Sequence, residues 1–290
     1  MNTIWSTYVQ KADMLHRTRT LRFADPFAAA YRAAFALGDG LDMLEVGCGT
    51  GALCQALRRW YPGAAIAGLD RDSTFIRFAA GLAPGVTFGE GDATALPFAD
   101  GCFDVTLSHT VQEHVEPAAF FGEQRRVLRP GGVCLVLSAR RGIHATAPCL
   151  AARENWEREI YERAQPCFDE ADRRYNVCAY PMSETELPAT MERYGFRSVS
   201  THYVVADLTP DNPRYPSNLA HAMIDANRQV ALDWVASLPE VAPGVVSEDE
   251  RAALTAAIHR RFDQRLALYD RGERQWDTNV SITMVVRGVK

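Results

Sequence analysis

Five short apolar runs alternate with segments of helical character between residues 41 and 139, and this alternation constrains the fold more than any other feature. Runs of this length that are apolar on both faces are typical of a parallel sheet covered by helices on both sides. The sequence therefore predicts a Rossmann-like, doubly wound α/β fold with its ligand site at the carboxyl ends of the strands. The runs are 41–46, 64–70, 86–90, 103–108 and 133–138, and the helical segments lie near 51–60, 73–82 and 117–129.

The rest of the chain adds strands and helices to this core. Two alternating, β-branched stretches at 198–208 and 279–288 predict further strands, giving a mostly parallel sheet of about seven. The stretches 140–195 and 210–275 are helical in character, and we expect them to form a cap over the site. We therefore expect three parts: an N-terminal helical segment that closes over the site (1–40), a ligand-binding core (41–139), and the remainder of the sheet with its cap (140–290).

Composition narrows the class of protein. Hydrophobic residues make up 47% and charged residues 23% of the chain, which predicts a soluble globular core. No apolar run reaches 18 residues and no signal-peptide pattern opens the chain, so we expect no membrane association. The net charge of −5 argues against a nucleic-acid partner. The seven cysteines show no CxxC spacing, which predicts neither a disulfide framework nor a zinc site and favours a reducing cytoplasm.

A glycine-rich loop follows the first predicted strand. Residues 44–51 read LEVGCGTG, with Gly47, Gly49 and Gly51 placed before a helix. Glycine permits the positive φ angles and the close backbone approach that a ligand-binding turn of this kind requires. The segment from Gly47 to Ala52 also fits the GxGxxA pattern of dinucleotide enzymes, and Asp70 at the end of the next strand satisfies both types. These features predict a ligand of adenosine type without choosing between cofactors.

Three later motifs distinguish between these kinds of cofactor. They are FGEGDATALPF at 88–98, FDVTLSHTV at 103–111 and RVLRPGG at 126–132. With them, roughly residues 40–140 of the sequence resemble class I S-adenosylmethionine (SAM)-dependent methyltransferases, especially the type 11 group that includes quinone-biosynthesis enzymes. The resemblance implies that the core at 41–139 binds SAM and that the product is S-adenosylhomocysteine.

The resemblance also implies roles for particular residues. Ribose presents two hydroxyl donors, and one ionised carboxylate can accept both. The resemblance implies that Glu45 and the backbone of Gly47, Cys48 and Gly49 surround the methionine part of SAM, and that Asp70 binds the ribose. It places Arg71 beside the adenine, and Asp92 and the Ala93 N–H at the adenine edge. It places Ser108 and His109 where the fourth strand opens onto the sulfonium.

Candidates near the acceptor are fewer. His109 and His114 are possible general bases or orienting groups, because a neutral imidazole can take a proton near pH 7; the alternative is that they line the following helix. Their H-x-x-x-E-H spacing differs from the zinc motifs, so we expect no metal site. Arg22 is the predicted partner of the SAM carboxylate, with a solvated helix face as the alternative. The aromatic residues at 152–180 line an acceptor pocket or form the core of the cap.

The sequence thus predicts a SAM-dependent methyltransferase that acts on a small-molecule acceptor. Two alternatives stay open. One is an NAD-dependent oxidoreductase on a similar sheet, and the other is a noncatalytic SAM-binding module.

Overall fold

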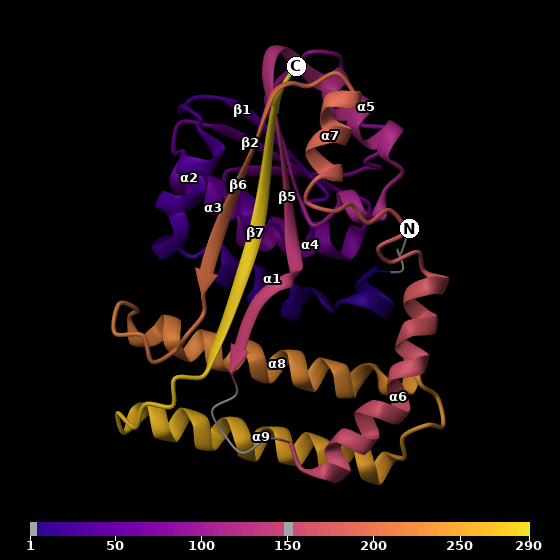
Figure 1. Cartoon of the computed structure of the whole chain (residues 1–290), viewed down its shortest axis with the longest axis vertical. Helices are drawn as coiled ribbons and strands as arrows, with labels where there is room; N and C mark the ends of the chain where they lie inside the picture. The colour runs from indigo at the N-terminus through magenta and orange to yellow at the C-terminus, as the bar shows by residue number, and fades with distance from the viewer. Residues whose placement is uncertain (1–4, 148–152) are drawn as a thin grey trace.

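A seven-stranded mixed sheet forms the centre of the computed structural model, which describes residues 5–147 and 153–290. The strand order is β3-β2-β1-β4-β5-β7-β6, and the prediction of a Rossmann-like α/β fold is confirmed (Figure 1). β1 to β5 run parallel, whereas β7 pairs antiparallel with both β5 and β6. The strands are β1 Asp42–Val46, β2 Ala65–Asp70, β3 Val86–Glu90, β4 Phe103–His109, β5 Leu128–Ala147, β6 Arg197–Asp207 and β7 Thr278–Val289.

Helices cover both faces of the sheet, as the apolar character of its strands requires. α2 (Ala28–Phe35) and α3 (Ala52–Trp60) share one core cluster with β1, β2 and β4. α5 (Pro117–Val127) and α7 (Glu186–Arg193) belong to a second cluster on the opposite face. Local signals fix where α5 begins: Pro117 is its first residue, and the Glu116 carboxylate accepts hydrogen bonds from the N–H groups of Ala118 and Ala119 at 2.9 and 2.8 Å.

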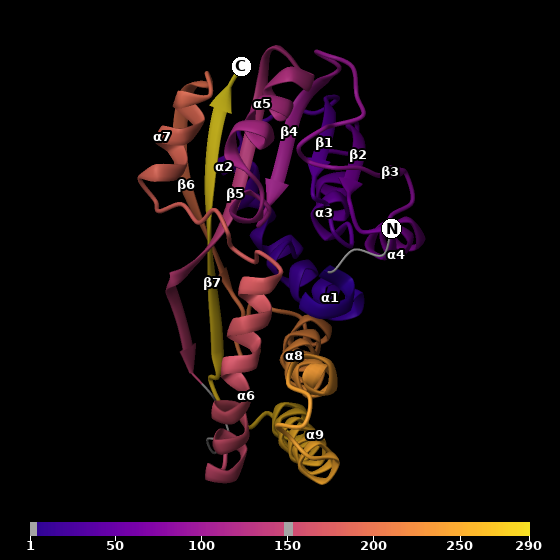
Figure 2. The ribbon, with the colours of Figure 1, turned by 90° about the vertical axis from the view of Figure 1, so that its right-hand side faces the viewer.

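The strands β5, β6 and β7 extend beyond the rest of the sheet toward a helical lobe (Figures 1 and 2). The prediction that 140–147 belongs to a helical insertion is wrong, because this segment continues β5 and pairs with β7 from His144 opposite Ser281 to Ala147 opposite Thr278. The partner strand lies more than a hundred residues further along the chain, so no local pattern signalled the pairing.

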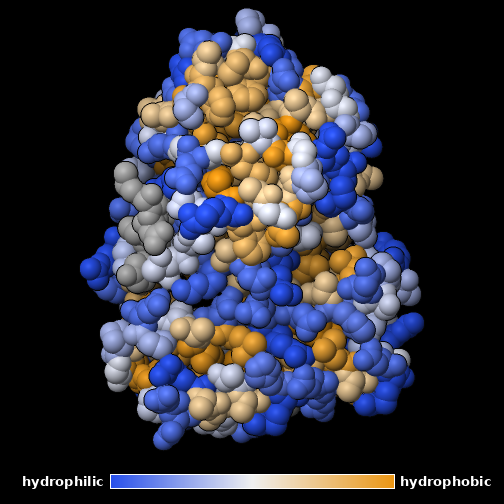
Figure 3. All heavy atoms as spheres, turned by 180° about the vertical axis from the view of Figure 1, so that it is seen from behind, coloured by the Kyte–Doolittle hydropathy of each residue, from blue (hydrophilic) through white to orange (hydrophobic). Residues whose placement is uncertain are grey.

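The helical lobe has its own core. α6 (Asn155–Arg174), α8 (Ser217–Val241) and α9 (Glu248–Asp270) contribute buried residues to a third cluster, and α8 also packs against α1 (Ala12–Arg22). Figure 3 shows the face opposite to that of Figure 1, where a band of mostly hydrophilic residues separates apolar areas above and below. The surface thus follows the division of the interior into an α/β core and a helical lobe.

The described cysteines, which exclude Cys149, are free thiols. Across the two described ranges, no helix combines the length and apolarity needed to span a bilayer. The remaining short elements are α4 (Ser73–Leu82), the single π-helical turn η1 (Trp5–Val9) and the short 3-10 helices η2 (Asp25–Phe27) and η3 (Gln112–His114).

Candidate functional site

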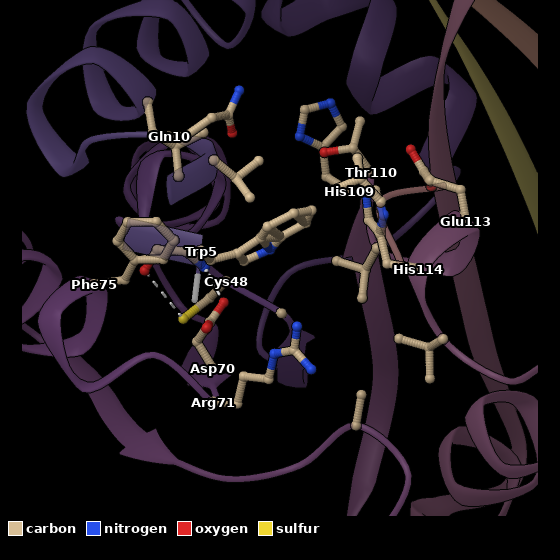
Figure 4. A pocket seen from close by; sticks show the side chains of 18 of the residues that line it. Trp5, Gln10, Cys48, Asp70, Arg71, Phe75, His109, Thr110, Glu113 and His114 are labelled. Atoms are coloured by element: carbon tan, nitrogen blue, oxygen red, sulfur yellow. Dashed lines mark hydrogen bonds between the residues drawn. The ribbon is translucent and has the colours of Figure 1, made fainter. Parts of the chain in front are cut away.

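A cavity of about 750 Å³ lies at the carboxyl ends of the parallel strands. The loops that follow β1, β2, β3 and β4 form its floor, as expected for a doubly wound sheet. α1, the turn η1 and residues 174–180 complete its walls. The cavity therefore brings together segments from the N-terminus, the core and the region after α6. Figure 4 shows residues of the first two, among them Trp5, Asp70 and His109.

The glycine loop takes the conformation that its sequence predicts. Gly47, Gly49 and Gly51 have φ angles of 72°, 52° and 74°, in the left-handed region. A Cβ atom on Gly47 would overlap the side chain of Val111, so a larger residue there would force Val111 to move. The loop is fastened to β2, because the N–H groups of Gly47 and Cys48 both donate to the Leu69 carbonyl, at 2.7 and 2.9 Å.

Glu45 lies beneath this loop as a buried acid. Its side chain is 2% exposed, yet it belongs to the cavity lining. Burial raises the pKa of Glu45 to about 8, so the carboxyl is mostly protonated at pH 7. The Cys54 thiol donates to its Oε2 at 2.9 Å. The site thus holds a neutral acid that a nearby cation would ionise.

Asp70 occupies the end of β2, where the sequence placed a ribose-binding acid. Its two carboxylate oxygens accept from the N–H groups of Gly49 at 2.8 Å and Asp72 at 2.9 Å. Burial raises the pKa of Asp70, and these two hydrogen bonds act against that rise. The carboxylate therefore fixes the glycine loop and still keeps lone pairs for a ligand. Arg71, the next residue, is exposed and also lines the cavity.

Asp92 and Ala93 follow β3 and line the same cavity. The Thr94 N–H and hydroxyl both donate to Oδ1 of Asp92, each at 2.8 Å. Oδ2 takes part in neither bond. The predicted adenine-binding pair is thus at the cavity wall with one acceptor oxygen outside the turn.

At the end of β4, the sequence predicts that both Ser108 and His109 face the ligand, but only one of them does. His109 lines the cavity, whereas Ser108 lies outside its lining as a fully buried residue, and its hydroxyl has no hydrogen-bond partner among the described residues. Alternate residues of a strand face opposite sides, so one of two neighbours must turn away. Ser108 pairs with Val136 of β5, which belongs to the second core cluster. The expectation that Ser108 opens onto the ligand is wrong for its side chain.

His109 is buried beside arginine side chains. Burial lowers the pKa of His109 well below its usual value, and the charges of Arg19 and Arg22 lower it further. Its ring meets Phe23 edge-on with centroids 4.9 Å apart, and among the described residues its Nε2 has no hydrogen-bond partner. The imidazole is therefore neutral across the physiological range.

His114 joins two walls of the cavity. Its Nδ1 accepts from the Cys178 N–H at 2.9 Å, and its ring meets Trp5 edge-on at 4.7 Å. Figure 4 shows Trp5 projecting into the cavity between Asp70 and His114. An Nδ1 that accepts a hydrogen bond carries no proton, so the neutral ring is protonated at Nε2 and has no vacant basic nitrogen. This geometry favours a positioning role over a role as general base.

Two arginines of α1 line the cavity, although the sequence singled out only Arg22 for the cofactor carboxylate. Arg22 is partly buried and forms no ion pair with the described residues. Arg19 donates from Nη2 to the Thr110 hydroxyl at 3.4 Å. Thr110 itself has a φ of 53°, an uncommon conformation for a residue other than glycine and one that recurs at functional sites. No local sequence signal pointed to Thr110.

The predicted aromatic residues of 152–180 divide between two environments. Trp156, Tyr161 and Phe168 pack, together with Ile160, in the core of the helical lobe. Tyr175 and Tyr180 line the cavity, and no residue of 210–275 belongs to its described lining. The helices α8 and α9 thus support the elements around the cavity from outside. No cluster of potential metal ligands occurs in the described ranges.

Comparison with known proteins agrees with this geometry. Residues 44–136 match the family model described as "Methyltransferase domain". The match and the fold confirm the resemblance to class I SAM-dependent methyltransferases, a class whose cofactor is SAM, and they do not favour an NAD-dependent oxidoreductase.

Curated relatives share the same part of the chain. A ubiquinone biosynthesis O-methyltransferase of Sinorhizobium medicae is 36% identical over 122 residues, which is 40% of this chain and 48% of the relative. A fatty-acid O-methyltransferase of Mycolicibacterium smegmatis is 41% identical over 112 residues, covering 37% of this chain and 40% of the relative. The chain spans less than half the length of these relatives, so the similarity concerns the cofactor half.

Solved structures share the fold at low sequence identity. A Haemonchus contortus phosphoethanolamine N-methyltransferase 2 in complex with SAM aligns with a TM-score of 0.53 at 14% identity, over 99% of this chain and 59% of that chain. At this identity the likeness shows the fold alone.

Proposed function

We propose that this chain is a SAM-dependent methyltransferase that transfers the methyl group to a small-molecule acceptor. One observation carries the proposal: a single cavity joins the glycine loop and Asp70 to the end of β4. A cofactor held at the first three strands and an acceptor at the fourth would share one enclosed space. The in-line attack of a methyl transfer requires such an arrangement.

The residues present fit SAM. Asp70 and Asp92 would accept hydrogen bonds from the ribose hydroxyls and the adenine amino group, with Arg71 beside the ring. Glu45 would receive the ammonium group, and Arg22 the carboxylate of the methionine part. These residues all line the cavity, and the positive φ angles of the glycine loop allow the backbone to approach the ligand closely. SAM carries no pyrophosphate, so the absence of a P-loop lysine from the glycine loop agrees with this ligand.

The protein's contribution to the reaction is then mainly alignment. SAM supplies a methyl group already activated on a sulfonium, so positioning and exclusion of water can provide much of the catalysis. Trp5 and residues 174–180 would close the cavity, and His114 holds both by its contacts with Trp5 and Cys178. His109, neutral and beside the end of β4, is the candidate to accept a proton from the acceptor.

A small acceptor suits the size of the cavity, because about 750 Å³ must hold both the cofactor and the acceptor. The curated relatives named above are O-methyltransferases, which is compatible with an oxygen acceptor. The acidic net charge of −5 is the basis for proposing a small molecule rather than nucleic acid. A cytoplasmic location belongs to the same proposal and rests on the cysteine spacing.

Ligand binding and turnover test the proposal separately. SAM and S-adenosylhomocysteine should raise the thermal midpoint, because a ligand selective for the folded state stabilises that state, and NAD should not. Stabilisation by NAD alone would overturn the proposal. Radiolabelled SAM with a panel of small acceptors then distinguishes an enzyme, which transfers label, from a noncatalytic SAM-binding module.

A further inference from the structure

The segment Trp5–Gln10, which we call the strap, forms part of the cavity wall. It consists of the π-helical turn η1 and of Gln10, whose N–H closes the turn by donating to the Trp5 carbonyl at 2.9 Å. Trp5, Val9 and Gln10 line the cavity. Turns of this wide kind are rare and often occur at functional sites. Only Lys11 separates the strap from α1, so the strap is a short element joined to the helix by a single linking residue.

Two contacts join the strap to opposite sides of the cavity. The Ser6 N–H donates to Oδ2 of Asp72, two residues after β2, at 2.9 Å. The Trp5 ring meets His114, in η3 after β4, edge-on at 4.7 Å. In the sheet β1 stands between β2 and β4, so the strap passes across the carboxyl end of β1, where the glycine loop lies. Figure 4 agrees with this course, because it shows the Trp5 side chain between Asp70 and His114.

Asp72 connects the strap to the predicted ribose acid. Its side chain is fully buried, and its Oδ1 accepts from the Thr74 N–H at 2.9 Å as the N-cap of α4. Its own N–H donates to Oδ1 of Asp70 at 2.9 Å, and Oδ2 of Asp70 accepts from the Gly49 N–H at 2.8 Å. One series of hydrogen bonds thus runs from Ser6 through Asp72 and Asp70 to the glycine loop. A ligand that binds at Asp70 and this loop would therefore contact the same network that holds the strap.

The hydrogen bond between Ser6 and Asp72 is the stronger of the two anchors. Both oxygens of Asp72 accept from N–H groups, as a carboxylate does, and such charge-assisted bonds are stronger than bonds between neutral groups. An edge-on contact between two rings contributes less. The ion pair of Lys11 with Glu240 spans 3.8 Å between side chains that are nearly half exposed, so it adds little. Rupture of the Ser6–Asp72 bond is thus the main step in lifting the strap.

A cofactor bound at Asp70 and the glycine loop would lie beneath the strap. We propose that Asp72 is a positioning residue that holds the strap closed over the cofactor, and that the Ser6–Asp72 hydrogen bond must break for the cofactor to enter or leave. This inference rests on the proposed function and adds to it a step that controls cofactor exchange. A lid of this kind excludes water from the reaction and can limit the rate of product release.

The rates of ligand exchange test the inference. Surface plasmon resonance on the immobilised full chain measures association and dissociation of S-adenosylhomocysteine; absence of binding to the unmodified protein would overturn the proposed function. Ser6→Pro removes the N–H donor at a position in the first turn of a helix, where proline is tolerated. Asp72→Asn keeps Oδ1 for the Thr74 N–H but sets an amide NH₂ against the Ser6 N–H.

Both variants should raise the association rate as well as the dissociation rate. A ligand that passes through an open state enters and leaves faster when that state is more populated. We expect dissociation to be roughly 10- to 100-fold faster, which corresponds to the loss of one charge-assisted hydrogen bond. Ser6→Ala is the matched control, because it keeps the backbone N–H and Ser6 lies outside the cavity lining, so its rates should stay within about three-fold of the unmodified protein.

The two variants together separate the strap from a purely structural role of Asp72. Faster exchange in both directions for Ser6→Pro, without the same change in Ser6→Ala, supports the inference. If Asp72→Asn speeds dissociation alone and Ser6→Pro leaves both rates unchanged, Asp72 acts only through Asp70 and the inference fails. If Asp72→Asn does not fold, Ser6→Pro decides alone, because it changes only the strap; unchanged rates in that variant then overturn the inference.

Discussion

Binding of the cofactor should release a proton from Glu45. In the free protein the pKa of Glu45 is about 8, chiefly because the carboxyl is buried. At pH 7 a group with that pKa is roughly nine-tenths protonated. An ammonium group placed against it favours the charged form, so binding should drive the proton off. We therefore expect release of roughly 0.8–0.9 proton per molecule of S-adenosylhomocysteine at pH 7, falling toward zero above pH 9.

Calorimetry in two buffers measures this release directly. Titrations in phosphate and in Tris differ in apparent enthalpy by the number of protons released multiplied by the difference in buffer ionisation enthalpy. Glu45→Gln removes the ionisable group and should abolish the difference, while Glu159→Gln, an exposed acid on α6, should leave it unchanged. Equal enthalpies in both buffers for the unmodified protein would refute the placement of the ammonium group at Glu45.

The same group makes a prediction about stability without ligand. The folded-state pKa of Glu45 is raised from 4.5 to about 8, so the folded state binds the proton more tightly than the unfolded chain. Stability from this group is greatest at low pH and is lost as pH rises from about 4.5 to about 8, by roughly 5 kcal/mol in total. The thermal midpoint of Glu45→Gln, measured against that of the unmodified protein, should therefore rise progressively between pH 5 and pH 9.

Three further substitutions test other parts of the structure. Asp70→Asn should weaken S-adenosylhomocysteine by about 2–4 kcal/mol, or roughly 30- to 700-fold in calorimetry, because an amide cannot serve both N–H donors and the ribose; an unchanged affinity in a folded variant would remove Asp70 from the ribose site. His114→Ala should raise the acceptor KM and leave single-turnover methyl transfer at saturation within roughly ten-fold, since its Nδ1 is bonded to the Cys178 N–H; a thousand-fold slower transfer step would make it a base. Arg265→Ala should destabilise the fold by about 3–5 kcal/mol in urea unfolding, because this buried arginine pairs with Asp211 at 2.9 Å and Asp277 at 2.6 Å; a loss under 1 kcal/mol would contradict that reasoning.

The cofactor half could be predicted from sequence because its signals are local. The glycines of 47–51 directly follow β1, and Asp70 is the last residue of β2. A pattern of a few residues therefore predicts both which residues form this part of the site and where they lie. The class predicted from these motifs is the one that the family match confirms. The orientations of the Ser108 and His109 side chains were harder to predict, because a correctly predicted strand does not show which of its residues face the cavity. Alternation alone excludes that both point into the cavity.

The acceptor half depends on contacts between distant segments. The His114 imidazole meets Trp5 on one side and the Cys178 backbone on the other, and neither neighbour lies within 60 residues of it in the chain. The continuation of β5 through 140–147 likewise depends on β7. Such contacts follow from tertiary packing, and short sequence patterns carry no record of them. This is why the sequence suggested Arg22 among the arginines of its segment from its place before the core, and gave no signal for Thr110.

A pH profile can reveal whether His109 acts as a base in the proposed reaction. A base is most effective when its pKa lies near the working pH, and burial together with the charges of Arg19 and Arg22 holds the pKa of His109 well below 6.5 in the free protein. The rate should therefore fall as acid protonates the imidazole, and this fall should come only at a pH well below 6.5. His109→Ala should remove the acid limb and lower kcat by roughly 10²–10⁴. If the rate shows no such fall and the variant stays within a few-fold of the unmodified rate, alignment of the acceptor with the sulfonium accounts for catalysis without a histidine base.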